Sequence, residues 1–213
     1  TFNASTNNLI NSSGKYDGTA NSCTYLKDTL HNSLKGAVYV VSGSAGKFGG
    51  TSAGYPHNAM EYSNVSNPGS VILDFDDNRL DVKWLCGDGV IRDQFTMMKN
   101  TGKLRTYTIN EGDSILLAAS WKGQYTWNNN SSTSKQNFAK PTVNSTIIVS
   151  DQYQCVADTF KITVLPLLAD FTIQNSIICA GTSIAYTNTS TSNATSYLWS
   201  FPGGTPSSSS DLN

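Results

Sequence analysis

The chain has 213 residues, and Ser, Thr and Asn together make up about a third of them. Only 14% of the residues are charged, and 14 Lys and Arg against 15 Asp and Glu give a formal net charge of -1. That balance excludes a nucleic-acid-binding protein that works by neutralising phosphates, and no apolar run approaches the roughly 18 residues of a membrane-spanning helix. Abundant Thr, Val, Ile and Tyr favour an all-β fold.

The four cysteines are widely spaced, without a Cys-x-x-Cys pair or a Cys/His cluster, and this spacing does not predict a zinc site. A weakly charged, hydroxyl-rich surface is typical of secreted proteins, in which disulfides persist. The sequence begins Thr-Phe-Asn-Ala-Ser without a signal peptide. Secretion therefore requires that residue 1 is not the natural start of the protein.

The first hundred residues predict loop followed by a β-meander. Residues 1–34 are polar and loop-like, whereas Ala37–Val41 is a short apolar run typical of a buried strand. Val71–Phe75 and Arg79–Leu85 predict a hairpin around an Asp-Asp-Asn turn, and Val90–Met97 predicts the third strand. A boundary is expected near residues 100–103.

An internal repeat follows the meander. Ile109–Ile115 aligns with Ile178–Ile184, and a Tyr-x-Trp string follows each of them, at Tyr125–Trp127 and Tyr197–Trp199. A unit of roughly 70 residues with strand-length alternation is typical of tandem β-sandwich modules, in which each Trp fills the space between two sheets.

The two repeats are expected to end differently. The first closes with strands at 145–150 and 159–165, and Pro166 marks the junction. The second stops at Asn213 before any equivalent closing strands, so it is either incomplete or completed by another chain.

Residues 1–102 resemble the C-terminal end of calcineurin-like metallophosphoesterases of the purple-acid-phosphatase type. The resemblance rests on Gly36–Lys47, His57–Met60, Gly69–Leu85 and Asp93–Met97, in that order. It implies that this segment is the terminal meander of an α/β enzyme domain that hydrolyses phosphate esters.

Two further segments resemble modules of secreted bacterial proteins. Residues 103–166, with Gly112–Leu117 and Val149–Cys155, are similar to bacterial surface Ig-like modules. Residues 167–213, with Ser196–Pro206, are similar to the start of a PKD domain. Such strings are common in large proteins exported by the type IX route, which implies secretion and a cell-surface location.

The phosphoesterase family holds a dinuclear metal centre with Asp, Asn and His from motifs that lie upstream of the segment matched here. This chain has two histidines, His31 and His57, and none of those motifs. A two-metal site needs several His and carboxylate ligands that converge on the reacting oxygens. The resemblance therefore implies no cofactor in this segment and a dinuclear metal centre in the parent chain. Without a second layer, the strands would expose an apolar face that includes Val38, Val40, Ile72 and Trp84.

His57 is the best remaining candidate for a site residue. The resemblance places its loop near the substrate mouth, so His57 and Glu61 are expected to line a phosphate pocket in the parent. The alternative is a loop histidine that is hydrogen-bonded to backbone.

A second candidate is an acidic cluster that could bind Ca²⁺ through carboxylate oxygens. Its members are Asp74, Asp76, Asp77 and Asp81. Asp-Asp-Asn is also the composition that a tight hairpin turn requires, because Asp and Asn tolerate a positive φ, and the turn is the favoured interpretation.

The remaining candidates are cysteines and aromatic residues. Cys23 and Cys86 share the first segment and are the disulfide candidates, whereas pairing of Cys155 with Cys179 has no support from the pattern. Among the tryptophans, Trp121 lies beside Lys122-Gly123 and is expected to be exposed, which makes a cell-surface glycan a candidate partner.

These observations predict an all-β chain with tandem Ig-like and PKD-like sandwich modules after the terminal phosphoesterase meander. The segment is predicted to be the non-catalytic part of a secreted metal-dependent phosphoesterase, and its modules act as spacers or surface attachments. Its expected partners are the upstream part of the parent chain or neighbouring β modules. The alternative is a structural or adhesive cell-surface protein without enzymatic activity.

Overall fold

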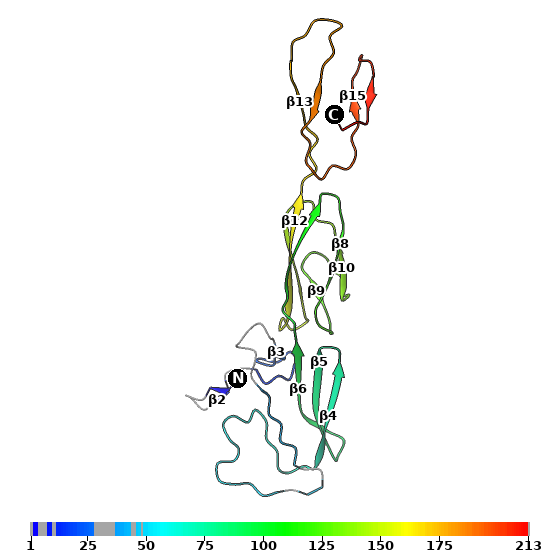
Figure 1. Ribbon diagram of the computed structural model, residues 1–213. Helices are drawn as coiled ribbons and strands as arrows, with labels where there is room; N and C mark the ends of the chain where they lie inside the picture. The colour runs from blue at the N-terminus through cyan, green and yellow to red at the C-terminus, as the bar shows by residue number, and fades with distance from the viewer. Residues whose placement is uncertain are drawn as a thin grey trace. The chain divides into compact units, whose positions relative to one another are not determined.

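The computed structural model describes residues 2–3, 8–9, 12–27, 37–43, 46–47 and 49–212 (Figure 1). These residues form β-strands and no helix, so the described part of the chain offers no helix that could cross a membrane. The prediction of an all-β fold is confirmed. The strands are β1 (Phe2–Asn3), β2 (Asn8–Leu9), β3 (Tyr25–Lys27), β4 (Gly69–Asp76), β5 (Arg79–Cys86), β6 (Ile91–Lys99), β7 (Leu104–Asn110), β8 (Ile115–Ala118), β9 (Thr126–Trp127), β10 (Gln136–Ala139), β11 (Ser145–Ser150), β12 (Ala157–Leu165), β13 (Phe171–Ile173), β14 (Tyr186–Asn188), β15 (Trp199–Ser200) and β16 (Ser208–Ser209).

The chain divides into two compact units. Unit 1 comprises Thr1–Arg105, Leu116–Asn137 and Ile147–Phe160, and unit 2 comprises Thr106–Ile115, Phe138–Thr146 and Lys161–Asn213. The boundaries fall inside β7, β8, β10, β11 and β12, so each of these strands belongs in part to both units, whereas β9 lies wholly in unit 1. These strands form a four-stranded sheet in the order β7-β12-β11-β9 and a two-stranded sheet of β10 and β8.

The predicted meander is present in unit 1 as a four-stranded sheet in the order β3-β6-β5-β4. β4, β5 and β6 are antiparallel neighbours, and β3 adds a parallel strand beside β6. The hairpin between β4 and β5 turns at Asp77 and Asn78, and Asp77 has a φ of 57°. This left-handed conformation is one that Asp and Asn adopt at low cost, and the predicted hairpin turn is present at these two residues.

The second part of unit 1 has a core of alternating buried residues. Ile147 and Val149 of β11 are buried, and Ile148 between them is exposed, which is the period expected of a strand with one covered face. Trp127 of β9 is also buried, and its ring stacks on that of Phe160 at a centroid distance of 5.8 Å. Trp127 is therefore a core residue, as its Tyr-x-Trp string predicts.

Unit 2 contains two short hairpins, β13–β14 and β15–β16, and a group of aromatic rings. Trp199 and Phe201 stack with an interplanar angle of 12°, and Tyr186 contacts both rings. Phe171 meets Tyr186 and Trp199 at 5.8 Å and is still 52% exposed. Trp199 thus occupies an aromatic cluster that is only half covered.

Two sequence predictions about apolar residues are wrong. Ala37–Val41 forms no strand with any described residue, and Tyr39 and Val41 are 90% and 96% exposed. Hydrophobicity alone does not supply the neighbouring strand that a buried strand requires. Trp121 was expected to be exposed but is fully buried against Tyr125, with ring centroids 5.7 Å apart. Its burial removes the exposed aromatic ring on which the glycan prediction rested.

Candidate functional site

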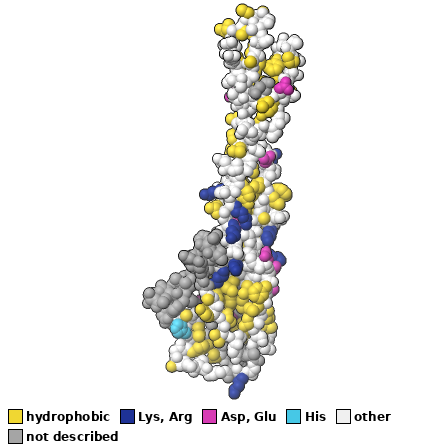
Figure 2. Space-filling model, viewed as in Figure 1, with side chains coloured by type: hydrophobic (Ala, Val, Ile, Leu, Met, Phe, Trp, Pro, Cys, Tyr) yellow, Lys and Arg dark blue, Asp and Glu magenta, His cyan; other side chains and the backbone are white. Residues whose placement is uncertain are grey.

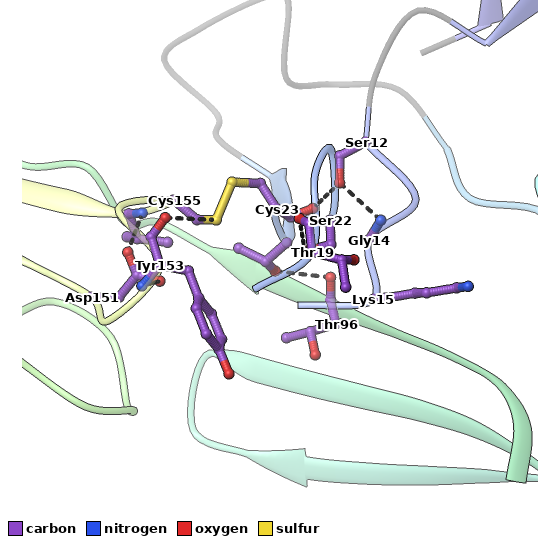
Figure 3. Close-up of a disulfide and its surroundings, with 12 residues drawn as sticks. Ser12, Gly14, Lys15, Thr19, Ser22, Cys23, Thr96, Asp151, Tyr153 and Cys155 are labelled. Atoms are coloured by element: carbon purple, nitrogen blue, oxygen red, sulfur yellow. Dashed lines mark hydrogen bonds between the residues drawn. A yellow bond between two sulfur atoms is a disulfide. The ribbon is translucent and has the colours of Figure 1, made fainter. Parts of the chain in front are cut away.

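The most developed polar and covalent arrangement in the described residues surrounds a disulfide between Cys23 and Cys155 (Figure 3). The two residues are 132 positions apart in the sequence, and their Cα atoms are 5.2 Å apart. The predicted partner of Cys23 was Cys86, and that pairing is wrong. Cys86 is a free, buried thiol at the end of β5, whereas the loop that carries Cys23 faces the turn between β11 and β12.

The loop before Cys23 is held against β6 by hydrogen bonds. The N–H of Thr96 donates to the carbonyl of Gly14 at 2.8 Å, and the hydroxyl of Thr24 donates to the carbonyl of Thr96 at 2.8 Å. The hydroxyl of Ser12 donates to the carbonyl of Cys23 itself. These contacts give Cys23 a fixed position although it belongs to a region that the sequence predicts to be loop.

The turn before Cys155 is organised by the buried carboxylate of Asp151. That carboxylate accepts hydrogen bonds from the N–H of Val156 at 2.8 Å and from the N–H of Tyr153 at 3.4 Å. The backbone closes the same turn, because the N–H of Asp151 donates to the carbonyl of Val156 at 3.0 Å. Asp151 therefore stabilises the turn that carries Cys155, and Figure 3 shows Asp151 in the same turn as Tyr153 and Cys155.

Two tyrosines and an arginine form a stack that begins at Tyr153, two residues before Cys155. The rings of Tyr16 and Tyr153 meet edge to face at a centroid distance of 5.1 Å. The guanidinium of Arg79 lies over the Tyr16 ring at 5.4 Å and forms a bidentate pair with Asp81 at 2.8 and 3.0 Å. We name the set Tyr16, Cys23, Arg79, Asp151, Tyr153 and Cys155 the disulfide junction.

The electrostatics of the disulfide junction favour neutral tyrosine. Burial raises the pKa of the Tyr16 phenol, and the nearby carboxylate of Asp151 raises it further. A buried phenol beside a carboxylate resists ionisation because a second negative charge would lack solvation. This arrangement does not activate Tyr16 as a nucleophile or base, and it is suited to a packing role.

A second polar anchor lies where β6 leads into β7. The carboxylate of Asp158, which is fully buried, accepts hydrogen bonds from the N–H of Lys103 at 2.6 Å and from the N–H and hydroxyl of Ser120 at 2.7 and 2.8 Å. Arg105 lies 3.7 Å from the same carboxylate. Asn78 donates to the carbonyls of Lys99 and Ser120 at 2.8 and 2.7 Å, which joins the β4–β5 turn to this anchor.

The predicted site residues His57 and Glu61 are both exposed. The Nδ1 atom of His57 accepts a hydrogen bond from the N–H of Ala59 at 3.1 Å, which is the local backbone contact that the alternative interpretation describes. Their role at a substrate mouth in a parent enzyme stays a prediction. His31, the other histidine, lies outside the described residues.

The predicted acidic cluster is used mainly in ion pairs. Asp76 pairs with Lys122 at 2.7 Å, Asp77 lies 3.9 Å from Lys135, and Asp81 is held by Arg79 and by the hydroxyl of Thr96 at 2.6 Å. Asp74 lies opposite Asp81 on the neighbouring strand. Over the described residues, no group of three or more His, Cys, Asp or Glu side chains is arranged to hold a metal ion.

The chain was compared with protein families, with curated sequences and with solved structures. No protein family matches the chain, and no curated protein matches its sequence. Among solved structures, a match is found to the N-terminal eight Ig domains of Down Syndrome Cell Adhesion Molecule (DSCAM) isoform 1.30.30, at 8% identity and a TM-score of 0.29. The match covers 59% of this chain and 21% of that chain.

Proposed function

We propose that this chain is a structural, non-catalytic part of an extracellular protein. In it, the meander and the following Ig-like strands unfold as one cooperative unit. The observation that supports this proposal is the Cys23–Cys155 disulfide, which joins a loop packed on β6 to the turn between β11 and β12. Structural disulfides persist in oxidising compartments and are rare in the cytosol, which favours a secreted or cell-surface location.

The noncovalent contacts support the same role. The Arg79–Tyr16–Tyr153 stack and the hydrogen bond from Asn78 to the carbonyl of Ser120 both connect the meander to residues beyond 102, so the disulfide reinforces a junction that polar and aromatic contacts also stabilise. A disulfide that closes so long a loop restricts the unfolded chain strongly and contributes about 3–5 kcal/mol in the chain-entropy account.

The experiment is urea unfolding of the oxidised chain, with matched variants and two local probes. Incorporation of 5-fluorotryptophan gives separate 19F resonances in the unmutated chain, of which that of Trp84 reports the meander and that of Trp127 reports the Ig-like strands. The oxidised chain is expected to give coincident transitions, and Cys23→Ser/Cys155→Ser is expected to separate them. Cys179→Ser, which removes an exposed free thiol, is the control and should change nothing. Separate transitions in the oxidised chain would contradict the proposal.

A phosphoesterase parent is the second candidate, and it is supported by the resemblance of residues 1–102 and by the β4–β5–β6 meander. In that parent, His57 and Glu61 would line the substrate mouth and the metal ligands would come from preceding sequence. The test is an assay of the intact parent for metal-dependent hydrolysis of p-nitrophenyl phosphate. Inactivity with metal bound would reject the enzyme and leave the structural proposal standing.

A further inference from the structure

The β3-β6-β5-β4 sheet has one apolar face and one charged face. Residues that oppose each other in the strand register lie on the same face, because side chains alternate along each strand. Asp74, Asp81 and Arg79 lie on the charged face. The other face carries three rows across the strands, which we name the apolar face: Phe75, Leu80, Met97 and Tyr25; Leu73, Val82 and Phe95; Val71, Trp84 and Asp93.

Part of the apolar face is open to solvent. Leu73 and Phe75 are 56% and 70% exposed, and Leu80, Phe95 and Met97 are half-buried, whereas Val82 at the centre is buried. Figure 2 shows hydrophobic side chains gathered over the region of β4, β5 and β6. Contiguous apolar surface of this kind marks an interaction site in a folded protein.

One end of the apolar face is basic. A pocket of about 350 Å³ opens there, and Phe75, Leu80 and Met97 line it together with the cations of Lys27, Lys99 and Arg79 and one carboxylate, that of Asp77. Lys27 and Lys99 oppose each other in register, so they form the next row on the same face, two residues beyond Met97. Two ammonium groups side by side make this end attractive to a carboxylate.

The opposite end of the apolar face is acidic. Asp93 lies on β6 with Lys99, on the same face and six residues earlier. Burial raises the pKa of Asp93, Lys15 lowers it, and Glu61 raises it, so both of those charged groups lie close to Asp93. Glu61 is exposed, and the carboxylates of Asp93 and Glu61 together outweigh the ammonium of Lys15.

We propose that the apolar face binds a second copy of this chain through a two-fold symmetric contact. A two-fold axis that crosses the strands between Phe95 and Met97 brings the two apolar faces together. The same axis places Lys99 opposite the partner's Asp93, and symmetry repeats that pair with the roles exchanged. Charge complementarity thus selects one antiparallel orientation of the two sheets.

The dimensions of the apolar face indicate how strongly two copies are expected to associate. Four strands about 4.8 Å apart span roughly 15 Å, and six residues along β6 span roughly 20 Å. The face therefore covers roughly 300 Å², and two faces together roughly 600 Å² in planar area, which is below the standard range of specific protein interfaces. The dimer is expected to be weak and reversible, with a Kd of about 100 μM.

Sedimentation velocity of the full chain in a Cys179→Ser background, from about 1 to 500 μM, measures this association. The mass is expected to rise from 22.9 kDa toward twice that value. Phe75→Asp is expected to weaken the dimer at least tenfold. Ile72→Asp, on the charged face of the same strand, is the matched control and should leave the Kd unchanged. A monomer throughout, or a dimer insensitive to Phe75→Asp, would overturn the proposal.

Charge reversal tests the orientation. Lys99→Glu and Asp93→Lys should each weaken the homodimer about tenfold, because each places like charges opposite one another. An equimolar mixture of the two variants should form heterodimers at wild-type strength, since every pair across the axis is then opposite in charge. Where Asp93→Lys fails to fold by circular dichroism, Glu61→Lys replaces it. No recovery on mixing would overturn the proposed orientation.

Discussion

The guanidinium of Arg79 lies over the ring of Tyr16, 5.4 Å from its centroid, and so places a residue of the N-terminal loop on the face of a sheet strand. Tyr16 also meets Tyr153 edge to face, which brings three distant parts of the chain to one phenol ring. Tyr16 has a φ of 52°, an uncommon conformation for a residue of its size. In this backbone conformation the Tyr16 side chain contacts both Arg79 and Tyr153.

Tyr16 and Tyr25 predict a loss of stability in alkali. Burial raises the pKa of Tyr25 to about 12 and raises that of Tyr16, whereas both titrate near 10 in the unfolded chain. The unfolded state therefore loses these protons first, so their contribution is complete below pH 10 and decreases as the pH rises toward 12. Thermal melts between pH 8 and 11.5 measure the decline.

Matched variants show which tyrosines cause the loss of stability in alkali. Tyr16→Phe and Tyr25→Phe should each flatten the decline, while Tyr39→Phe, at an exposed position, should not alter it. The difference in absorbance at 295 nm between the parent chain and each of the Tyr16→Phe and Tyr25→Phe variants should appear only above pH 10 in the folded protein. A difference that appears at or below pH 10 without unfolding would contradict the prediction.

Replacement of Asp158 by Ala should reduce the free energy of unfolding by about 3 kcal/mol or more. The change leaves the part-buried N–H groups of Lys103 and Ser120 without their acceptor. Asp113→Ala is the control, because Asp113 is exposed and accepts one hydrogen bond from Asn110, so its loss should cost below about 1 kcal/mol. Urea titration of both variants under oxidising conditions gives the comparison.

The free thiols should differ in reactivity. Cys179 is exposed and Cys86 is 3% exposed, so a thiol reagent should modify one cysteine quickly in the native protein and a second only after unfolding. Peptide mapping under non-reducing conditions should recover Cys23 linked to Cys155. Recovery of a Cys23–Cys86 peptide would show that the connectivity of the disulfide junction is different.

The regular parts of the fold are readable from local sequence. The alternation in Val71–Phe75 and Arg79–Leu85 and the turn residues between them predict the β4–β5 hairpin. In the structure β4 is longer at both ends, and β5 begins at Arg79 as predicted and ends one residue later. Both closing strands of the first repeat are also found, as β11 and β12. In these segments the period of the side chains and the turn chemistry point to the same structure.

The junction could not be predicted because it depends on contacts between distant residues. Nothing near Cys23 distinguishes Cys86 from Cys155 as its partner, and Tyr16, Arg79 and Asp158 carry no local pattern. The predicted exposed face was also incorrect in part. Ile72 and Trp84 were assigned to one surface, but Ile72 opposes Lys83 on the charged face and Trp84 opposes Val71 on the apolar one. A hairpin register, which sets the face, is fixed only when the turn is known.

The tryptophans of the two Tyr-x-Trp strings should contribute differently to the free energy of unfolding, although the strings have the same pattern. Trp127 is 3% exposed, stacks on Phe160 and donates from Nε1 to the carbonyl of Ser134 at 2.9 Å, so Trp127→Ala should cost about 3–5 kcal/mol. Trp199 is half-buried in the aromatic cluster of unit 2, and Trp199→Ala should cost roughly 1–2 kcal/mol. Urea unfolding of each variant, with Leu198→Ala at an 85% exposed position as the control, measures the difference. Equal costs at the two tryptophans would mean that unit 2 covers Trp199 as completely as unit 1 covers Trp127.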